Sequence, residues 1–133
     1  MLYDDQAARF DARAGLPPGA AEAVAQALDE AVGPVAGQAW LEVGAGTGEL
    51  ILPLLRRGIR YAGFDSSPAM LEVFRAKAPR AELHLADGNA RWPAADRSAD
   101  VVFCSRALHH LEPGHAAAET RRVLRPPGGW LVL

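Results

Sequence analysis

Apolar residues follow two spacings along this chain, one typical of helices and one typical of buried strands. Val24, Leu28 and Val32 recur every four residues, which predicts a helix over 20–32 that ends before Gly33. Short apolar runs between polar or turn residues predict four buried strands and the beginning of a fifth. These runs are 39–43, 60–64, 81–86, 99–104 and 130–133.

Helical patterns separate the predicted strands. Ser67 followed by Pro68 is typical of a helix start, with the hydroxyl as cap and the proline in the first turn. Strands that alternate with helices indicate βαβ units, so we expect an α/β protein with a mainly parallel sheet. Ligands of such sheets bind in the loops that follow the strands. Beside 20–32, the predicted helices are 4–13, 49–57, 67–79 and 116–124.

Three alternating glycines and one carboxylate follow the first two predicted strands. Gly44, Gly46 and Gly48 carry no side chains, so the backbone there can turn sharply and come close to a ligand. Asp65 lies 17 residues after Gly48, where it can accept hydrogen bonds from the two hydroxyls of a ribose. A glycine turn without a ligand and a carboxylate that only favours a helix N-terminus are the alternatives. The pairing of the two features favours a nucleoside ligand.

Two further features indicate which kind of nucleoside ligand this is. A dinucleotide fingerprint needs glycine at position 49, but the chain has Glu49, whose carboxylate would repel a pyrophosphate. Asp87-Gly88 follows the third strand, where the carboxylate can accept a hydrogen bond from an amine such as adenine N6. An ordinary Asp-Gly turn is the alternative. An NAD-dependent oxidoreductase is therefore the less favoured function.

Composition narrows the class of protein. The 133 residues are 50 % hydrophobic and 23 % charged, which is typical of a globular domain. A formal net charge of -2 gives no electrostatic reason to expect nucleic acid or an anionic membrane as a partner. The single cysteine, Cys104, cannot form an internal disulfide, and no stretch has the pattern of a signal peptide or a membrane span. We therefore expect a cytoplasmic protein.

Five segments in order carry the recognisable chemistry of the chain. They are Glu42-Val-Gly-Ala-Gly-Thr-Gly48, Phe64-Asp-Ser-Ser-Pro-Ala-Met70, Ala86-Asp87-Gly88, Asp100-Val-Val-Phe-Cys-Ser105 with His109-His110, and Arg122-Val-Leu-Arg-Pro-Pro-Gly-Gly129. Together these segments resemble the successive motifs of class I S-adenosylmethionine-dependent methyltransferases. The nearest subgroup is the type 11 methyltransferase domain, which resembles quinone-biosynthesis methyltransferases. The resemblance extends from about Leu41 to the C-terminus.

The resemblance implies a Rossmann-like three-layer αβα sandwich that binds S-adenosyl-L-methionine and transfers its methyl group to a small molecule by in-line displacement. The glycine loop would approach the methionine part of the cofactor, and Glu42 would orient its amino group. Asp65 would hold the ribose beside Ser66 and Met70, and Asp87 would contact the adenine amine. The implied cofactor-binding residues are Glu42, Gly44, Ala45, Gly46, Gly48, Asp65, Ser66, Met70, Asp87, Gly88, Asn89 and Ser105.

Candidate residues for the reaction itself follow the fourth strand. The resemblance implies that Ser105 lies near the methyl group, whereas Gly88 or Asn89 lines the adenine ring. His109 or His110 is a candidate general base for acceptors that need one, and a histidine that caps or packs in the next helix is the alternative. Two adjacent histidines lack the further ligands of a metal site, so no metal is expected.

The ends of the chain lead to two more expectations. We expect a single domain with an N-terminal helical lid region over 1–36 and a Rossmann-like core over 37–133. Tyr3, Phe10 and Arg13 are lid candidates by resemblance, and an ordinary packed N-terminal helix is the alternative. The chain stops within the predicted fifth strand, whereas the complete family fold has further strands, so it looks truncated.

That early stop leaves three interpretations open. The chain can be a fragment, a minimal domain completed by a partner chain such as a homodimer mate at the open sheet edge, or a non-catalytic cofactor-binding module. The sequence predicts neither the methyl acceptor nor whether carbon, nitrogen or oxygen is methylated.

Overall fold

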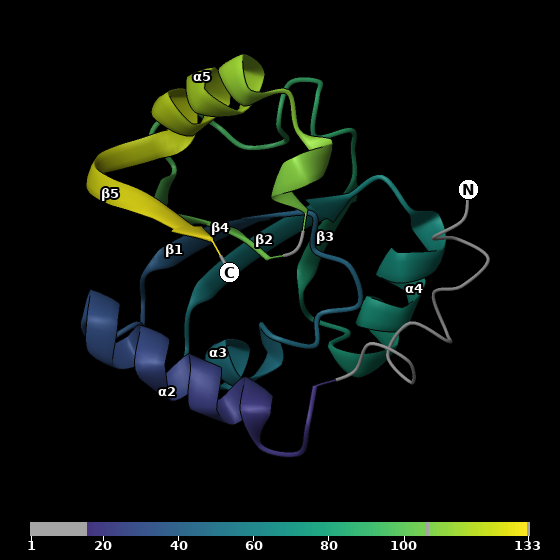
Figure 1. Ribbon diagram of the computed structural model, residues 1–133, viewed down its shortest axis with the longest axis vertical. Helices are drawn as coiled ribbons and strands as arrows, with labels where there is room; N and C mark the ends of the chain where they lie inside the picture. Colours follow the sequence, from purple (N-terminus) through teal and green to yellow (C-terminus); the bar gives the residue numbers. More distant parts are fainter. Residues whose placement is uncertain (1–15, 106, 133) are drawn as a thin grey trace.

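The computed structural model describes residues 16–105 and 107–132, which form a parallel sheet between two layers of helices (Figure 1). The strands are β1 (Ala39–Val43), β2 (Arg60–Asp65), β3 (Glu82–Leu85), β4 (Ala99–Cys104) and β5 (Leu124–Val132). The helices are α2 (Ala20–Val32), α3 (Leu52–Arg56), α4 (Pro68–Lys77), α5 (Pro113–Val123) and the 3₁₀ turn η1 (Leu108–His110). The expected three-layer α/β fold is confirmed.

The strand order places the carboxyl ends of the central strands at one edge of the sheet. All neighbours pair in parallel in the order β3-β2-β1-β4-β5, so the order reverses between β1 and β4. Crossover connections leave such a reversal point in opposite directions, and a crevice remains above it. The loops after β1, β2 and β4 therefore border one crevice.

Side chains of the central strands alternate between two apolar layers. Trp40 and Phe103 pack together on the face covered by α2, α3 and α4, with ring centroids 5.7 Å apart. Phe64 and Trp92 pack on the face covered by α5, with ring centroids 5.8 Å apart. Because both faces are covered, β1 and β4 are almost continuously buried, and each is apolar except for one acidic residue, Glu42 or Asp100.

Two helices begin at other positions than the sequence pattern predicts. Helix α3 begins at Leu52 rather than at position 49, because Pro53 is tolerated only in the first helical turn. Helix α5 begins at Pro113 rather than at position 116, since the Glu112 carboxylate accepts hydrogen bonds from the amides of Gly114 and His115 and caps the helix there. By contrast, α4 has the predicted cap, with the Ser67 hydroxyl accepting from the Met70 amide.

Strand β5 also begins earlier than the predicted position 130. Leu124 pairs with Ala99, and regular pairing resumes only where Gly129 meets Val101. The residues between them bulge from the ladder because Pro126 and Pro127 have no amide hydrogen to donate. The predicted helix ends at 124 and the predicted strand begins at 130, whereas the residues between them form an irregular first part of the strand.

The predicted helix over 4–13 and the lid candidates Tyr3, Phe10 and Arg13 lie outside the described residues. Helix α2 belongs to the segment expected to form the lid region, and it packs into the core through Ala25 and Leu28. Within the described part of the chain, every helix is too short or too polar to cross a bilayer.

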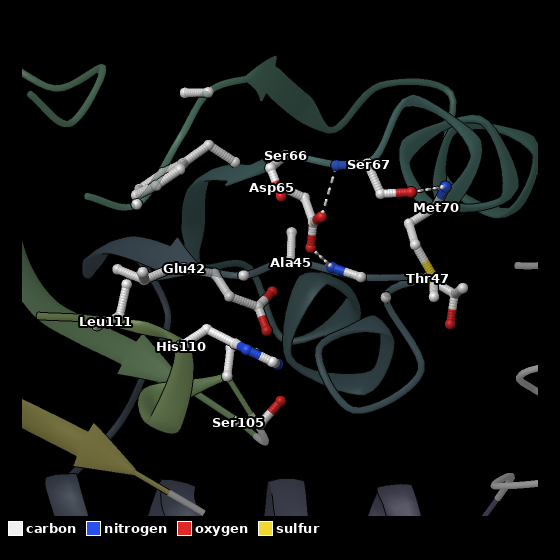
Figure 2. Close-up of a pocket in the computed structure, with 18 of the residues that line it drawn as sticks. Glu42, Ala45, Thr47, Asp65, Ser66, Ser67, Met70, Ser105, His110 and Leu111 are labelled. Carbon is white, nitrogen blue, oxygen red and sulfur yellow. Dashed lines mark hydrogen bonds between the residues drawn. The ribbon is translucent and has the colours of Figure 1, made fainter. Parts of the chain in front are cut away.

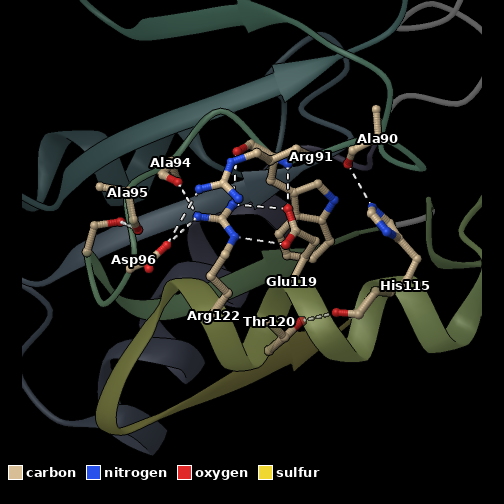
Figure 3. Close-up of polar contacts among 12 residues, drawn as sticks. Ala90, Arg91, Ala94, Ala95, Asp96, His115, Glu119, Thr120 and Arg122 are labelled. Atoms are coloured by element: carbon tan, nitrogen blue, oxygen red, sulfur yellow. Dashed lines mark hydrogen bonds and ion pairs between the residues drawn. The ribbon is translucent and has the colours of Figure 1, made fainter.

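An ion pair within α5, between Arg122 and the buried Glu119, also hydrogen-bonds to the loop between β3 and β4 (Figure 3). The Arg122 guanidinium donates to both carboxylate oxygens of Glu119, at 2.8 and 3.0 Å, and to the carbonyl oxygens of Trp92 and Ala94. Glu119 also accepts from the Trp92 amide, and the Trp92 indole donates to the Gly88 carbonyl at 2.8 Å. Helix α5 therefore supports the turn that follows β3.

Replacing Arg122 by Met should destabilise the fold by about 3 kcal/mol, because Glu119 would stay buried without its cation. Urea unfolding of the parent and the variant measures this difference. Arg121→Met is the matched control, since Arg121 is an exposed neighbour on the same helix. Equal stability of the two variants would contradict a supporting role for the ion pair.

The same ion pair should make the free energy of unfolding depend on pH in the acidic range. Hydrogen bonds from Arg122 lower the pKa of Glu119 from 4.5 to about 2. The stabilisation is therefore complete above pH 4.5 and is lost as the pH falls toward about 2. In unfolding experiments at successive pH values, Glu119→Gln should lose less stability over this interval than the parent. Some slope should remain, since the pKa of Asp100 is also lowered by the amide of Ala39 and by Arg125. An unchanged slope would count against the assignment.

Candidate cofactor site

A pocket of about 450 Å³ opens at the crevice above β1, β2 and β4 (Figure 2). Its volume lies within the usual range for small-molecule sites. All twelve residues predicted to bind the cofactor line this one pocket, and that role stays a prediction. The other lining residues are Val43, Thr47, Glu49, Leu50, Phe64, Ser67, Ala86, Ala107, His110 and Leu111.

Two glycines of the loop lack a side chain for different reasons. At Gly48 a Cβ atom would lie 2.9 Å from the Phe74 ring, so glycine allows the loop to pack on α4. At Gly46, where φ is 57°, a Cβ atom would meet nothing within 4 Å. The backbone at Gly46 therefore borders open pocket space, which fits a loop that a ligand approaches closely.

Asp65 ties the glycine loop to the start of α4. One carboxylate oxygen accepts from the Gly46 amide at 2.9 Å, and the other accepts from the Ser67 amide at 2.9 Å (Figure 2). Each oxygen of a carboxylate has a second lone pair, so these bonds leave acceptor capacity for the hydroxyls of a ribose. The sequence indicated the ribose role and, as its alternative, a role at the helix N-terminus, but it did not indicate the bond to Gly46.

Glu42 and Asp65 lie on opposite sides of Ala45 in the glycine loop (Figure 2). Glu42 is only 2 % exposed and accepts a hydrogen bond of 2.6 Å from the Tyr61 hydroxyl. Burial first, and then the charge of Glu42, raise the pKa of Tyr61 well above 10, so the phenol stays protonated and donates. Tyr61 was missed by the sequence analysis, because no motif contains it.

The turn after β3 is compatible with both predictions made for Asp87-Gly88, an ordinary Asp-Gly turn and a ligand-binding carboxylate. The exposed Asp87 accepts from the Asn89 amide, as in an ordinary Asp-Gly turn, and it also lines the pocket. Asn89 bridges this turn to the segment after η1, since its side chain donates to the His110 carbonyl and accepts from the Glu112 amide. Asn89 therefore joins two loops that border the pocket, besides its implied place near the adenine.

The two candidate bases have different positions. His110 lines the pocket on the side where β4 ends, together with Ser105 (Figure 2), whereas His109 does not line it. Their rings are close, with centroids 3.9 Å apart.

The nearby Cys104 is fully buried, and burial raises its pKa to about 11, so its thiol is neutral and a poor nucleophile. No three potential metal ligands gather anywhere in residues 16–105 and 107–132.

The pocket is acidic. Its lining includes the carboxylates of Glu42, Glu49, Asp65 and Asp87 and, among the described residues, no lysine or arginine. One oxygen of Glu49 accepts from the Leu16 amide at 2.7 Å, whereas the other is buried without a hydrogen-bond partner in the described structure. Such a pocket attracts cationic ligands and repels a pyrophosphate.

Comparison with known proteins agrees with this geometry. The profile of a family described as "Methyltransferase domain" matches residues 41–133. A demethylmenaquinone methyltransferase of Renibacterium salmoninarum is 36 % identical over 134 residues, which cover 99 % of this chain and 56 % of that protein. An uncharacterised methyltransferase of Mycobacterium tuberculosis (strain H37Rv) is 39 % identical over 95 residues, which cover 71 % of this chain and 39 % of that one.

Comparison with a solved structure also indicates a methyltransferase fold. The S-adenosylmethionine-dependent methyltransferase of Mesorhizobium loti is 26 % identical and has a TM-score of 0.73, over 86 % of this chain and 53 % of that one. This chain spans 56 %, 39 % and 53 % of the length of these three proteins. The resemblance read from the five sequence segments is confirmed, and with it the cofactor class. The chain belongs to the methyltransferase domain family, within the S-adenosylmethionine-dependent class I enzymes.

Proposed function

We propose that this chain binds S-adenosylmethionine in the pocket above β1, β2 and β4 and transfers its methyl group to a small molecule. The observation that carries the proposal is the convergence of the glycine loop, Glu42, Asp65 and Asp87 on one pocket. Asp65 offers acceptors for the ribose hydroxyls, Asp87 offers one for the adenine amine, and Glu42 offers one for the amino group.

The charge of the pocket favours this cofactor over NAD. S-adenosylmethionine carries a sulfonium and an ammonium group, both of which the acidic lining would attract. The pyrophosphate of NAD would instead lie close to Glu49, whose second carboxylate oxygen is buried without a hydrogen-bond partner in the described structure. Desolvation would make that repulsion stronger than it is in water.

The residues of the chain contribute mainly by position. The bound cofactor would supply an electrophilic methyl group, and no side chain has to act as a nucleophile. The glycine loop would approach the methionine part and Asp65 would hold the ribose, while Ala107 and Leu111 add apolar surface to the pocket lining. Alignment of donor and acceptor can lower the barrier by roughly 7–11 kcal/mol. His110 would take a proton from the methyl acceptor.

The proposed class of methyl acceptor comes from the name of one relative. The Renibacterium protein is named as a demethylmenaquinone methyltransferase, so a reduced naphthoquinone is the first acceptor to test. Such a molecule is small, aromatic and electron-rich at the carbon to be methylated. His110 would accept a hydroxyl proton, which makes the ring carbon more nucleophilic. After that carbon takes the methyl group, it loses its own ring proton to restore the aromatic ring, and the hydroxyl regains a proton.

Asp65→Asn should weaken binding of S-adenosylmethionine about 10- to 100-fold, because it removes charge-assisted hydrogen bonds to the ribose. Isothermal titration calorimetry measures the dissociation constants of parent and variant. Glu72→Gln is the control, since this carboxylate is exposed on α4 and does not line the pocket. A parent chain that does not bind, or a variant that binds equally well, would overturn the proposal.

His110→Gln should lower kcat for methylation of the reduced naphthoquinone by about a hundredfold, and it should leave the affinity for S-adenosylmethionine nearly unchanged. His109→Gln is the matched control, because His109 does not line the pocket. Initial rates with radiolabelled methyl donor measure the effect. Equal rates in both variants would remove His110 as the base, and binding without transfer to any acceptor would indicate a binding module.

A further inference from the structure

We propose that Tyr61 is a positioning residue that fixes the Glu42 carboxylate where it meets the amino group of the bound cofactor. This inference rests on the proposed function and adds a residue to it that lies outside every sequence motif. The Tyr61 hydroxyl donates to Glu42 at 2.6 Å, the short distance typical of a hydrogen bond to a charged acceptor.

The register of the sheet produces this contact. Glu42 of β1 lies directly beside Gly63 of β2, and Tyr61 precedes Gly63 by two residues. Side chains two residues apart point to the same face of a strand, so Tyr61 and Glu42 share the face that α2, α3 and α4 cover. The Tyr61 side chain extends along β2, across Gly63, to reach the carboxylate.

Gly63 leaves the space that this path requires. A Cβ atom at position 63 would lie 2.1 Å from the Tyr61 hydroxyl oxygen and 2.7 Å from the ring carbon that bears it. Gly63 is buried in a strand, where glycine is otherwise unfavourable. Its presence is explained by the close approach of the phenol.

The phenol is held in place before any ligand binds. The Tyr61 ring packs against Phe74 of α4 with centroids 5.8 Å apart, and Phe74 in turn contacts Gly48 of the glycine loop. Since packing already orders the ring, little conformational entropy is lost when the hydrogen bond forms. The raised pKa of Tyr61 keeps the phenol a donor throughout the physiological range.

Loss of the Tyr61 hydroxyl should weaken the binding of only one part of the ligand, its amino-acid group. Without the Tyr61 donor, the buried Glu42 carboxylate would lose a partner and could turn away from the ligand's amino group. The adenosine part would be held from the other side of the glycine loop by Asp65, whose carboxylate bonds to the Gly46 and Ser67 amides and whose charge is the smallest of the influences that raise the pKa of Tyr61. The effect should therefore require a ligand that carries the amino-acid group.

Tyr61→Phe tests this directly, because it removes the hydroxyl and keeps the ring. S-adenosylhomocysteine has the amino-acid group, whereas 5′-methylthioadenosine lacks it. Calorimetry should show about a tenfold loss of affinity for the first ligand and less than a twofold change for the second. Asp65→Asn is the control for the adenosine part, and it should weaken both ligands.

A second variant keeps the proposal open to contradiction if Tyr61→Phe fails to fold, and a double variant tests the pair if it folds. Gly63→Ala should displace the phenol and give the same selective loss. In a Glu42→Gln background, Tyr61→Phe should have a clearly smaller effect than in the parent, because the two residues act as a pair. Equal losses for both ligands would mean a merely structural role, and no loss for either would mean no role. A parent chain that binds neither ligand would instead refute the proposed function itself.

Discussion

The pocket depends on the reversal of strand order between β1 and β4. The two central strands send their crossovers in opposite directions, so the loops after them separate and a crevice stays open above the sheet. Asp65 then gives the crevice its shape, because its two oxygens hold the Gly46 amide and the Ser67 amide at the same time. A single side chain thus sets the distance between the glycine loop and α4, and it remains available to a ligand.

The rest of the site is organised around holding a cation rather than around a reactive side chain. The lining carboxylates of Glu42, Glu49, Asp65 and Asp87 make the pocket negative. Two side chains close to it, the Cys104 thiol and the Tyr61 phenol, are kept neutral, since burial raises the pKa of Cys104 to about 11 and that of Tyr61 well above 10. This division fits methyl transfer, in which the donor is already reactive and the protein has to align it with an acceptor and exclude water.

The fold could be predicted wherever the local pattern has one explanation. Strands β1 and β4 have the predicted bounds because both of their faces are buried, so each is apolar except for one acidic residue, Glu42 or Asp100. The predicted first residues of α5 and β5 were wrong, because the observed ones are set by a capping side chain and by irregular strand pairing, which the apolar pattern does not contain. Glu112 caps α5 ahead of its apolar pattern, and Leu124 pairs with Ala99 before the prolines break the ladder.

The site could be predicted where a motif carries the chemistry, and not where neighbouring strands create it. Gly46 and Asp65 are recognisable by residue type and spacing, and both line the pocket. Tyr61 becomes relevant only once β1 and β2 are in register, since its contact with Glu42 crosses from one strand to the next over Gly63. Sequence spacing along one strand contains no information on that register.

The most direct test of the account is a crystal structure of this chain with S-adenosylhomocysteine. The account predicts that the ribose hydroxyls lie within hydrogen-bond distance of the Asp65 carboxylate, and that the amino group lies on the Glu42 side of the glycine loop. A ligand bound elsewhere, or bound in this pocket with its ribose away from Asp65, would contradict it.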